Sequence, residues 1–223
     1  MKQIFQKNFP FFIPYILVWL VVLAIVLTTT KLEQMQWINS HNNPWGDWFF
    51  YGATQLGEGW FWVAIIVLFL FIGFEKAIIL GVSLLLSTLI SSSLKLYFDT
   101  IRPIGFFEKQ KLTWHFVDGV IINLHQSFPS GHTTTAFAIF MMLTLFVKHK
   151  NWGFLFVILA WLTGYSRTYL LQHFPVDVLV GSVIGFFSSV LVYYLLIKSY
   201  KKTPKDWHGR SLRSYWNRGS RGE

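Results

Sequence analysis

A run of 20 residues without a charged side chain, Phe11 to Thr30, constrains this chain more than any other feature. A helix needs about 20 mostly apolar residues to cross the hydrocarbon core of a bilayer, so this run is long enough for one span. Lys2 and Lys7 precede the run, as in a cleaved signal peptide, but the run is longer than a signal peptide requires and no small-x-small cleavage site follows. The sequence therefore predicts an uncleaved membrane anchor.

Five more apolar stretches follow, at 61–74, 77–98, 133–147, 152–171 and 176–197. Only 13% of the residues are charged and 53% are hydrophobic, which excludes an ordinary soluble domain of this length. We expect an all-α, polytopic membrane protein, a bundle of about six transmembrane helices that forms a single domain over residues 1–223, with a basic tail from about residue 198. Because the second stretch is short, we expect its helix to begin near Thr54 and to include Gly57 and Gly59.

The distribution of positive charge predicts the orientation in the membrane. Lysines and arginines are concentrated at the N-terminus, in the even-numbered loops and in the tail, so the positive-inside rule places both termini in the cytoplasm.

The first loop, Lys31 to Gly59, carries Trp37, Trp45 and Trp48, and we expect it to lie along the outer surface. The basic tail predicts contact with anionic lipid headgroups rather than with nucleic acid. The chain contains no cysteine, which excludes disulfides and thiolate metal sites.

The first of three polar clusters is Lys95-Leu-Tyr-Phe-Asp-Thr-Ile-Arg102-Pro103. A separation of seven residues on a helix returns two side chains to nearly the same face, so Lys95 and Arg102 are expected to point together. Pro103 disfavours helical geometry at Arg102, and we expect the helix to end about there.

The second cluster is Pro129-Ser130-Gly131-His132, directly before an apolar run. Ser130 is well placed as an N-cap, and the free N–H groups of a helix N-terminus bind anions. Gly131 lets an oxyanion approach the backbone closely, and His132 adds a titratable proton.

The third cluster is Ser166-Arg167, then His173, then Asp177. An ionisable residue such as Arg167 at the end of a membrane helix is costly enough to indicate function. We expect Pro175 to open the last helix, which places His173 just before it and Asp177 in its first turn. A carboxylate bonded to one ring nitrogen makes the other a better nucleophile.

Each cluster alone is a weak signal, but their order and their common position at one membrane face are specific. The pattern Lys-x6-Arg-Pro, Pro-Ser-Gly-His, Ser-Arg-x5-His-x3-Asp resembles the signature of the type 2 phosphatidic acid phosphatase superfamily, the lipid phosphate phosphatases related to vanadium haloperoxidases. No signature position departs from it, and the resemblance covers nearly the whole chain except the basic tail.

The resemblance implies a membrane hydrolase that uses neither a metal nor another cofactor. It implies that His173 attacks phosphorus, that Asp177 orients its ring, and that His132 protonates the leaving group and then activates water. The residues implied to hold the phosphate are Lys95, Arg102, Ser130, Gly131 and Arg167. The expected partners are a lipid phosphate substrate and membrane lipids, and the expected location is the cell (inner) membrane, with the active site on the extracytoplasmic side.

The most strongly expected substrate is undecaprenyl diphosphate, while phosphatidylglycerophosphate, phosphatidic acid and lipid A phosphates stay open. A halide-oxidising enzyme would share the anion site, but the family members of that kind are typically soluble and larger. A non-catalytic lipid binder or a transporter is the alternative from another class, because intramembrane cations also line substrate pathways.

Overall fold

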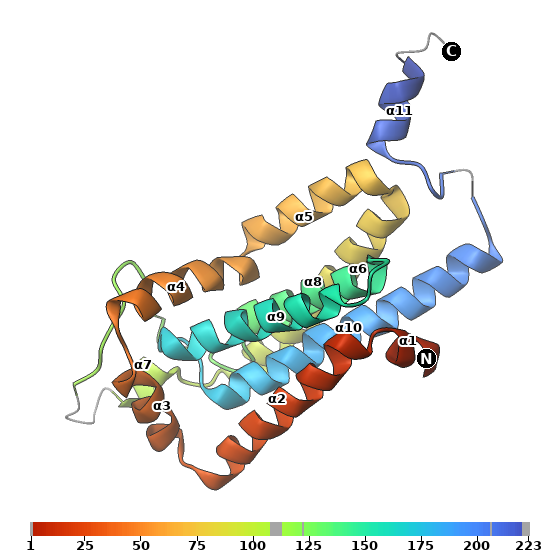
Figure 1. Cartoon of the computed structure of the whole chain (residues 1–223). Coiled ribbons are helices and arrows are strands. Elements are labelled where there is room, and N and C mark those ends of the chain that lie inside the picture. The colour runs from red at the N-terminus through yellow and green to blue at the C-terminus, as the bar shows by residue number, and fades with distance from the viewer. Residues whose placement is uncertain (1, 108–112, 122, 206, 220–223) are drawn as a thin grey trace.

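The chain folds into a bundle of helices (Figure 1). The structure is a computed structural model that describes residues 2–107, 113–121, 123–205 and 207–219. Every regular element within these ranges is a helix, so the prediction of an all-α fold is confirmed. The end of the basic tail, residues 220–223, lies outside the described residues.

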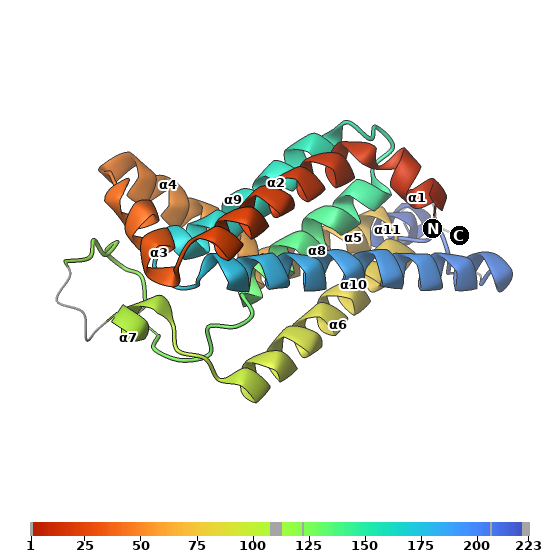
Figure 2. The same ribbon diagram turned by 90° about the horizontal axis from the view of Figure 1, so that it is seen from below.

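The six apolar stretches of the sequence all form helices, although their bounds shift by several residues. They are α2 (Phe9–Thr28), α5 (Gly59–Ile72), α6 (Phe74–Phe98), α8 (Gly131–Phe146), α9 (Trp152–Tyr169) and α10 (Pro175–Lys202). The remaining elements are shorter: α1 (Lys2–Lys7), α3 (Lys31–Ser40), α4 (Pro44–Thr54), the 3-10 turn η1 (Gln55–Gly57), α7 (Pro103–Phe107) and α11 (Leu212–Gly219). The short helices gather at the two ends of the bundle. Helices α3, α4 and α7 lie at one end, which we call the α3–α4 end, and α1 and α11 lie at the other (Figures 1 and 2).

The outward faces of the peripheral helices are apolar. Leu17 and Val21 on α2 are exposed, as are Leu85 and Leu89 on α6. Among the described residues, three segments are long and apolar enough to cross a bilayer, Phe9–Thr28, Phe74–Phe107 and Pro175–Lys202. Pro44–Gly57 and Gly59–Ile72 meet the same criterion as a pair, bent by 52°. Such faces match a lipid environment, because an exposed apolar surface of this extent is unfavourable in water.

Helix α8 lies at the centre of the bundle, in contact with α6, α9, α10 and η1. Its residues from Ala136 to Met142 are almost completely buried. Gly181 and Gly185 of α10 face α8 at a spacing of four, so they lie on one side of α10. A Cβ at Gly181 would come within 2.6 Å of the Ser130 carbonyl oxygen, and one at Gly185 would meet the Thr134 carbonyl oxygen. The two glycines therefore let the backbones of α8 and α10 touch.

Two sequence-based boundaries were wrong. The segment 31–59, which the sequence analysis treats as a loop, consists mostly of two helices, α3 and α4. The helix expected to run from Thr54 through Gly57 and Gly59 is instead broken, since Glu58 between η1 and α5 has an extended backbone with φ −76° and ψ 153°. Hydropathy alone does not reveal this break, because the apolar run continues directly after it.

Candidate active site

His173 and Asp177 form a buried pair where α10 begins. Pro175 opens α10, His173 precedes it, and Asp177 lies in its first turn, as the sequence predicts. His173 Nδ1 lies 3.5 Å from Asp177 Oδ2, close but without the alignment of a hydrogen bond. Asp177 Oδ2 also accepts from Ser127 Oγ at 2.5 Å and from the Phe174 N–H at 2.9 Å. The carboxylate is therefore fixed by two donors and faces one nitrogen of the imidazole.

The imidazole of His173 is neutral at ordinary pH. Burial lowers the pKa of His173 to about 3, an effect that Asp177 opposes and that the charges of Arg167 and Arg102 reinforce. A neutral ring with Nδ1 turned towards a carboxylate leaves Nε2 as the nitrogen with a free lone pair. His173 therefore has the electronic state required of a nucleophile.

The N-termini of α8 and α10 meet beside this pair. Ser130 is the N-cap of α8, and its side chain accepts from the Thr133 N–H, as expected. The Ser130 N–H donates to the Asp177 carbonyl oxygen at 3.0 Å, which joins the two helix starts. Gly131 follows, and a Cβ built there would lie 3.6 Å from Cε of Lys95. The positive ends of two helix dipoles therefore face one region.

Three cations surround the pair. Arg167 is almost completely buried, and Arg102 is 9% exposed. Arg102 donates to the Gln172 side chain and to the His125 carbonyl oxygen, both at 2.8 Å, and Lys95 donates to the Gln126 carbonyl oxygen at 2.9 Å. Lys95 lies within electrostatic reach of Arg102, Arg167 and Asp177. Within the described ranges none of the three forms a salt bridge with Asp or Glu, so each can offer its charge to a bound anion.

Lys95 and Arg102 reach the site by a different route from the one the sequence predicts. Helix α6 ends at Phe98, and Asp99 follows with φ 36°, so the two cations do not share a helical face. Arg102 is held instead by a hydrogen bond from its N–H to the Leu124 carbonyl oxygen at 2.8 Å. Arg102 is therefore positioned by a contact with a segment more than 20 residues away along the chain, and not by sharing a helical face with Lys95.

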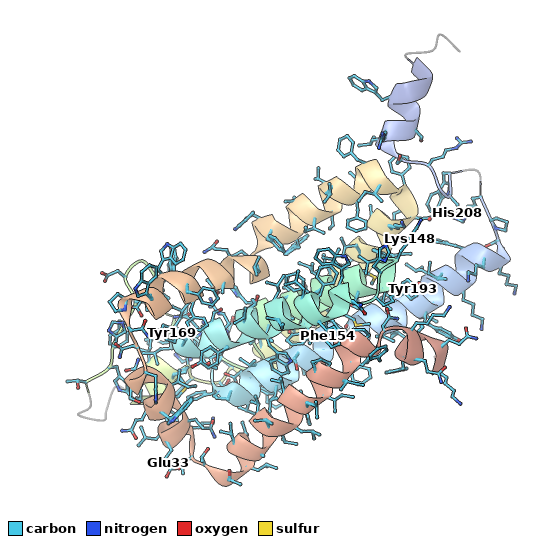
Figure 3. The ribbon with its side chains drawn as sticks, viewed as in Figure 1. Glu33, Lys148, Phe154, Tyr169, Tyr193 and His208 are labelled. Atoms are coloured by element: carbon cyan, nitrogen blue, oxygen red, sulfur yellow. The ribbon has the colours of Figure 1, made fainter. Side chains whose placement is uncertain are left out.

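Arg167 is anchored by residues of α4. Its Nη1 donates to Thr54 Oγ1 at 2.6 Å, while its buried Nε has no hydrogen-bond partner among the described residues. Two residues further along, Tyr169, which is labelled in Figure 3, ends α9. Its hydroxyl donates to Asp47 Oδ1 of α4 at 2.8 Å. The α4–α9 contact thus sets the position of the guanidinium, and its free N–H is available to a ligand.

Glu58 is a site residue that the sequence analysis missed. Its Oε1 lies 2.8 Å from His132 Nε2. The guanidinium of Arg167 also lies within electrostatic reach of the Glu58 side chain. The available signal was an isolated acid between Gly57 and Gly59, directly before an apolar run.

The arrangement combines a neutral imidazole, a second imidazole and a set of cations. The charge of Arg167 acts on both His132 and His173, so both rings lie close to one guanidinium. Such a site can bind a multiply charged oxyanion, supply a nitrogen nucleophile and move a proton, which are the requirements of phosphoryl transfer.

Residues 76–201, more than half of the chain, match the PAP2 superfamily. This chain belongs to the PAP2 superfamily. The matched range contains Lys95, Arg102, Ser130, Gly131, His132, Arg167, His173 and Asp177. Glu58 and Thr54 lie outside that range.

Three curated bacterial proteins are similar to this PAP2 chain. The bacitracin transport permease protein BcrC of Bacillus licheniformis is 37% identical over 38% of this chain and 37% of its own length. The undecaprenyl-diphosphatase BcrC of Bacillus subtilis is 34% identical over 45% of this chain and 61% of its own length. The lipid A 4'-phosphatase of Porphyromonas gingivalis is 28% identical over 78% of this chain and 74% of its own length. The chain thus spans less than two thirds of both BcrC relatives.

The crystal structure of LpxE from Aquifex aeolicus shares the fold of this PAP2 chain. It superposes with a TM-score of 0.64 at 29% identity and covers 73% of this chain and 94% of LpxE. With the apolar helices, the relatives identify the chain as an integral membrane protein.

Proposed function

We propose that this chain is a membrane hydrolase that removes a phosphate from a lipid phosphate or diphosphate through a phosphohistidine intermediate. The observation that carries the proposal is the His173–Asp177 pair, a neutral imidazole oriented by a carboxylate among three cations. Membership in the PAP2 superfamily supports the same activity. The cations would neutralise the phosphate oxygens, which is the main requirement of phosphoryl transfer.

In the first step, Nε2 of His173 attacks phosphorus while Asp177 holds the Nδ1 side of the ring. The N–P bond forms as the P–O bond to the lipid breaks, and His132 gives its proton to the departing oxygen. Arg167, Lys95 and Arg102 bind the equatorial oxygens, together with Ser130 and the Gly131 N–H. The lipid alcohol, or the lipid monophosphate when the substrate is a diphosphate, leaves protonated.

In the second step, His132 takes a proton from water. The resulting hydroxide attacks phosphorus, the N–P bond breaks, and inorganic phosphate is released with His173 restored. The residues that perform both steps supply positive charge and protons themselves, so we propose that the reaction requires no metal.

Undecaprenyl diphosphate is the proposed preferred substrate, because the BcrC relative of B. subtilis is named for that activity. The P. gingivalis relative is named as a lipid A 4'-phosphatase and aligns over more of the chain, which makes lipid A the second candidate. Phosphatidylglycerophosphate and phosphatidic acid carry the same reactive group.

The test is phosphate release by the purified protein in detergent with excess EDTA, compared across those four lipids. We expect release in EDTA, with the highest kcat/KM for undecaprenyl diphosphate. His173→Ala should lower turnover by about 1,000-fold or more and His132→Ala by about 100-fold or more, with both variants folded. Near-normal turnover by His173→Ala, or strict dependence on added magnesium, would contradict the mechanism.

A transporter is the second candidate, because the B. licheniformis relative is named as a transport permease. A transporter does not break a P–O bond, so the same assay separates the two. A protein that binds the four lipids but releases no phosphate from any of them would favour transport.

A further inference from the structure

Glu58 lies where two helical segments are interrupted. Helix α4 and the turn η1 end at Gly57, and α5 begins at Gly59, so Glu58 is the single extended residue between two helical segments. The break lies against the start of α8, where a Cβ at Gly57 would lie 2.8 Å from both Cβ and the carbonyl oxygen of His132. Glycine therefore permits an approach that directs the next side chain, Glu58, at the imidazole.

The Glu58–His132 contact parallels the Asp177–His173 pair. Each couples one carboxylate to one imidazole. The Glu58–His132 contact is the shorter of the two, at 2.8 Å against 3.5 Å for Asp177–His173. The charged groups that act on His132 are Glu58 from the break, Arg167 from α9 and Lys95 from α6. Burial of the ring and these two cations disfavour its protonated form, and Glu58 is the anion that opposes them.

We propose that Glu58 is a positioning residue that holds His132, with its proton, for transfer to the leaving group. The inference rests on the proposed function, because it assigns a partner to the general acid of that reaction. With Nε2 held by Glu58, Nδ1 is the nitrogen that gives its proton to the leaving oxygen as the P–O bond breaks. The same nitrogen accepts the proton of the attacking water in the second step.

The chemistry of the leaving group gives the diagnostic test. A lipid alcohol is a poor leaving group and requires protonation, whereas the 4-nitrophenolate released from 4-nitrophenyl phosphate departs without it. A residue that positions the general acid should therefore matter for the first substrate and little for the second. A residue that only stabilises the fold should affect both equally.

The experiment compares kcat/KM of the wild type, Glu58→Gln and the control Glu33→Gln on a lipid phosphomonoester and on 4-nitrophenyl phosphate. Glutamine has the shape of glutamate without its charge, and Glu33 on α3 is an acid outside the site. We expect Glu58→Gln to lower kcat/KM for the lipid by about 10- to 100-fold, which is part of the roughly 100- to 10,000-fold that a general acid contributes. The value for the aryl ester should fall by less than about threefold, and Glu33→Gln should match the wild type on both.

Equal losses on the two substrates, or none, would overturn the assignment while leaving the proposed function intact. A lower KM with unchanged kcat would also overturn it, because it would mean that Glu58 blocks the phosphate site instead of positioning His132. If the wild type releases phosphate from neither substrate, the proposed function fails, and the role of Glu58 fails with it.

Discussion

His173 and Arg167 are both buried, and each has a nitrogen without a protein hydrogen bond. His173 Nδ1 and Arg167 Nε lack aligned partners among the described residues. A buried polar group without a partner costs about 1–3 kcal/mol, and more when it is charged. A bound anion would give Arg167 Nε a partner, whereas Nδ1 of His173 already faces the Asp177 carboxylate at 3.5 Å.

The state of His173 gives a prediction about pH. Its pKa in the folded protein is about 3, whereas an unperturbed histidine titrates near pH 6.5. Because the folded-state pKa is lowered, the unfolded chain binds more protons than the folded chain between about pH 3 and pH 6.5. The stability associated with the neutral ring is thus complete above about pH 6.5 and is lost progressively as the pH falls from there to about 3.

The measurement is a pH titration of the ¹⁵N-histidine NMR signals in detergent, with His173→Gln to identify the signal of His173. We expect the ring to stay neutral from pH 8 to pH 5. A His173 midpoint near pH 6.5 would contradict the buried, neutral nucleophile.

At the scale of elements, the site depends on two close contacts with α8. The start of α10 touches α8 through Gly181, and the η1–α5 break touches it through Gly57. The first contact brings Asp177 to Ser130, and the second brings Glu58 to His132. The proposed catalytic groups are therefore positioned by backbone packing between helices, which small residues make possible.

We expect Gly57→Ala to disturb the second contact. The new Cβ would lie 2.8 Å from backbone and Cβ atoms of His132, which cannot rotate away, so η1 must move. The expected cost is about 1–3 kcal/mol of stability, together with a lower kcat/KM for the lipid substrate. Thermal unfolding and phosphate release measure the two effects.

Gly52→Ala is the matched control. Gly52 lies on the exposed face of α4, and a Cβ there would meet nothing within 4 Å. Alanine is the better helix former, so this variant should be as stable as the wild type or up to about 1 kcal/mol more stable. If Gly57→Ala behaves like Gly52→Ala, the contact between the break and α8 does not position the site.

The end of the molecule opposite α3 and α4 is rich in basic residues. Glu33 and Tyr169 lie at the α3–α4 end, while Lys148 and His208 lie towards the other end (Figure 3). The basic residues of α1 and of the last turn of α10 also belong to that other end. By the positive-inside rule we propose that this end faces the cytoplasm and that the site faces outward.

Because the chain has no cysteine, single-cysteine labelling can test this orientation without background. Ser40 on α3 and Ser199 on α10 are both exposed and lie near opposite ends. In intact cells, a membrane-impermeant maleimide should label Ser40→Cys but should label Ser199→Cys only after permeabilisation. Labelling with the reverse preference would show that the site faces the cytoplasm.

The sequence by itself determined the features that depend on local physics. The apolar runs predict the helices because a bilayer requires continuous apolar surface, and the caps at Ser130 and Pro175 follow from the preferences of helix starts. The pattern around His173 and Asp177 also predicts their proximity, since residues four apart on a helix start are neighbours.

Only the tertiary structure decided the contacts between distant segments. Glu58 meets His132 across 74 residues and Thr54 meets Arg167 across 113, while Ser127 reaches Asp177 across 50. The prediction that Lys95 and Arg102 share a helical face was wrong because α6 ends at Phe98, and a contact with Leu124 holds Arg102 instead. No periodicity encodes such pairs, because they arise from how closely helix backbones can approach one another.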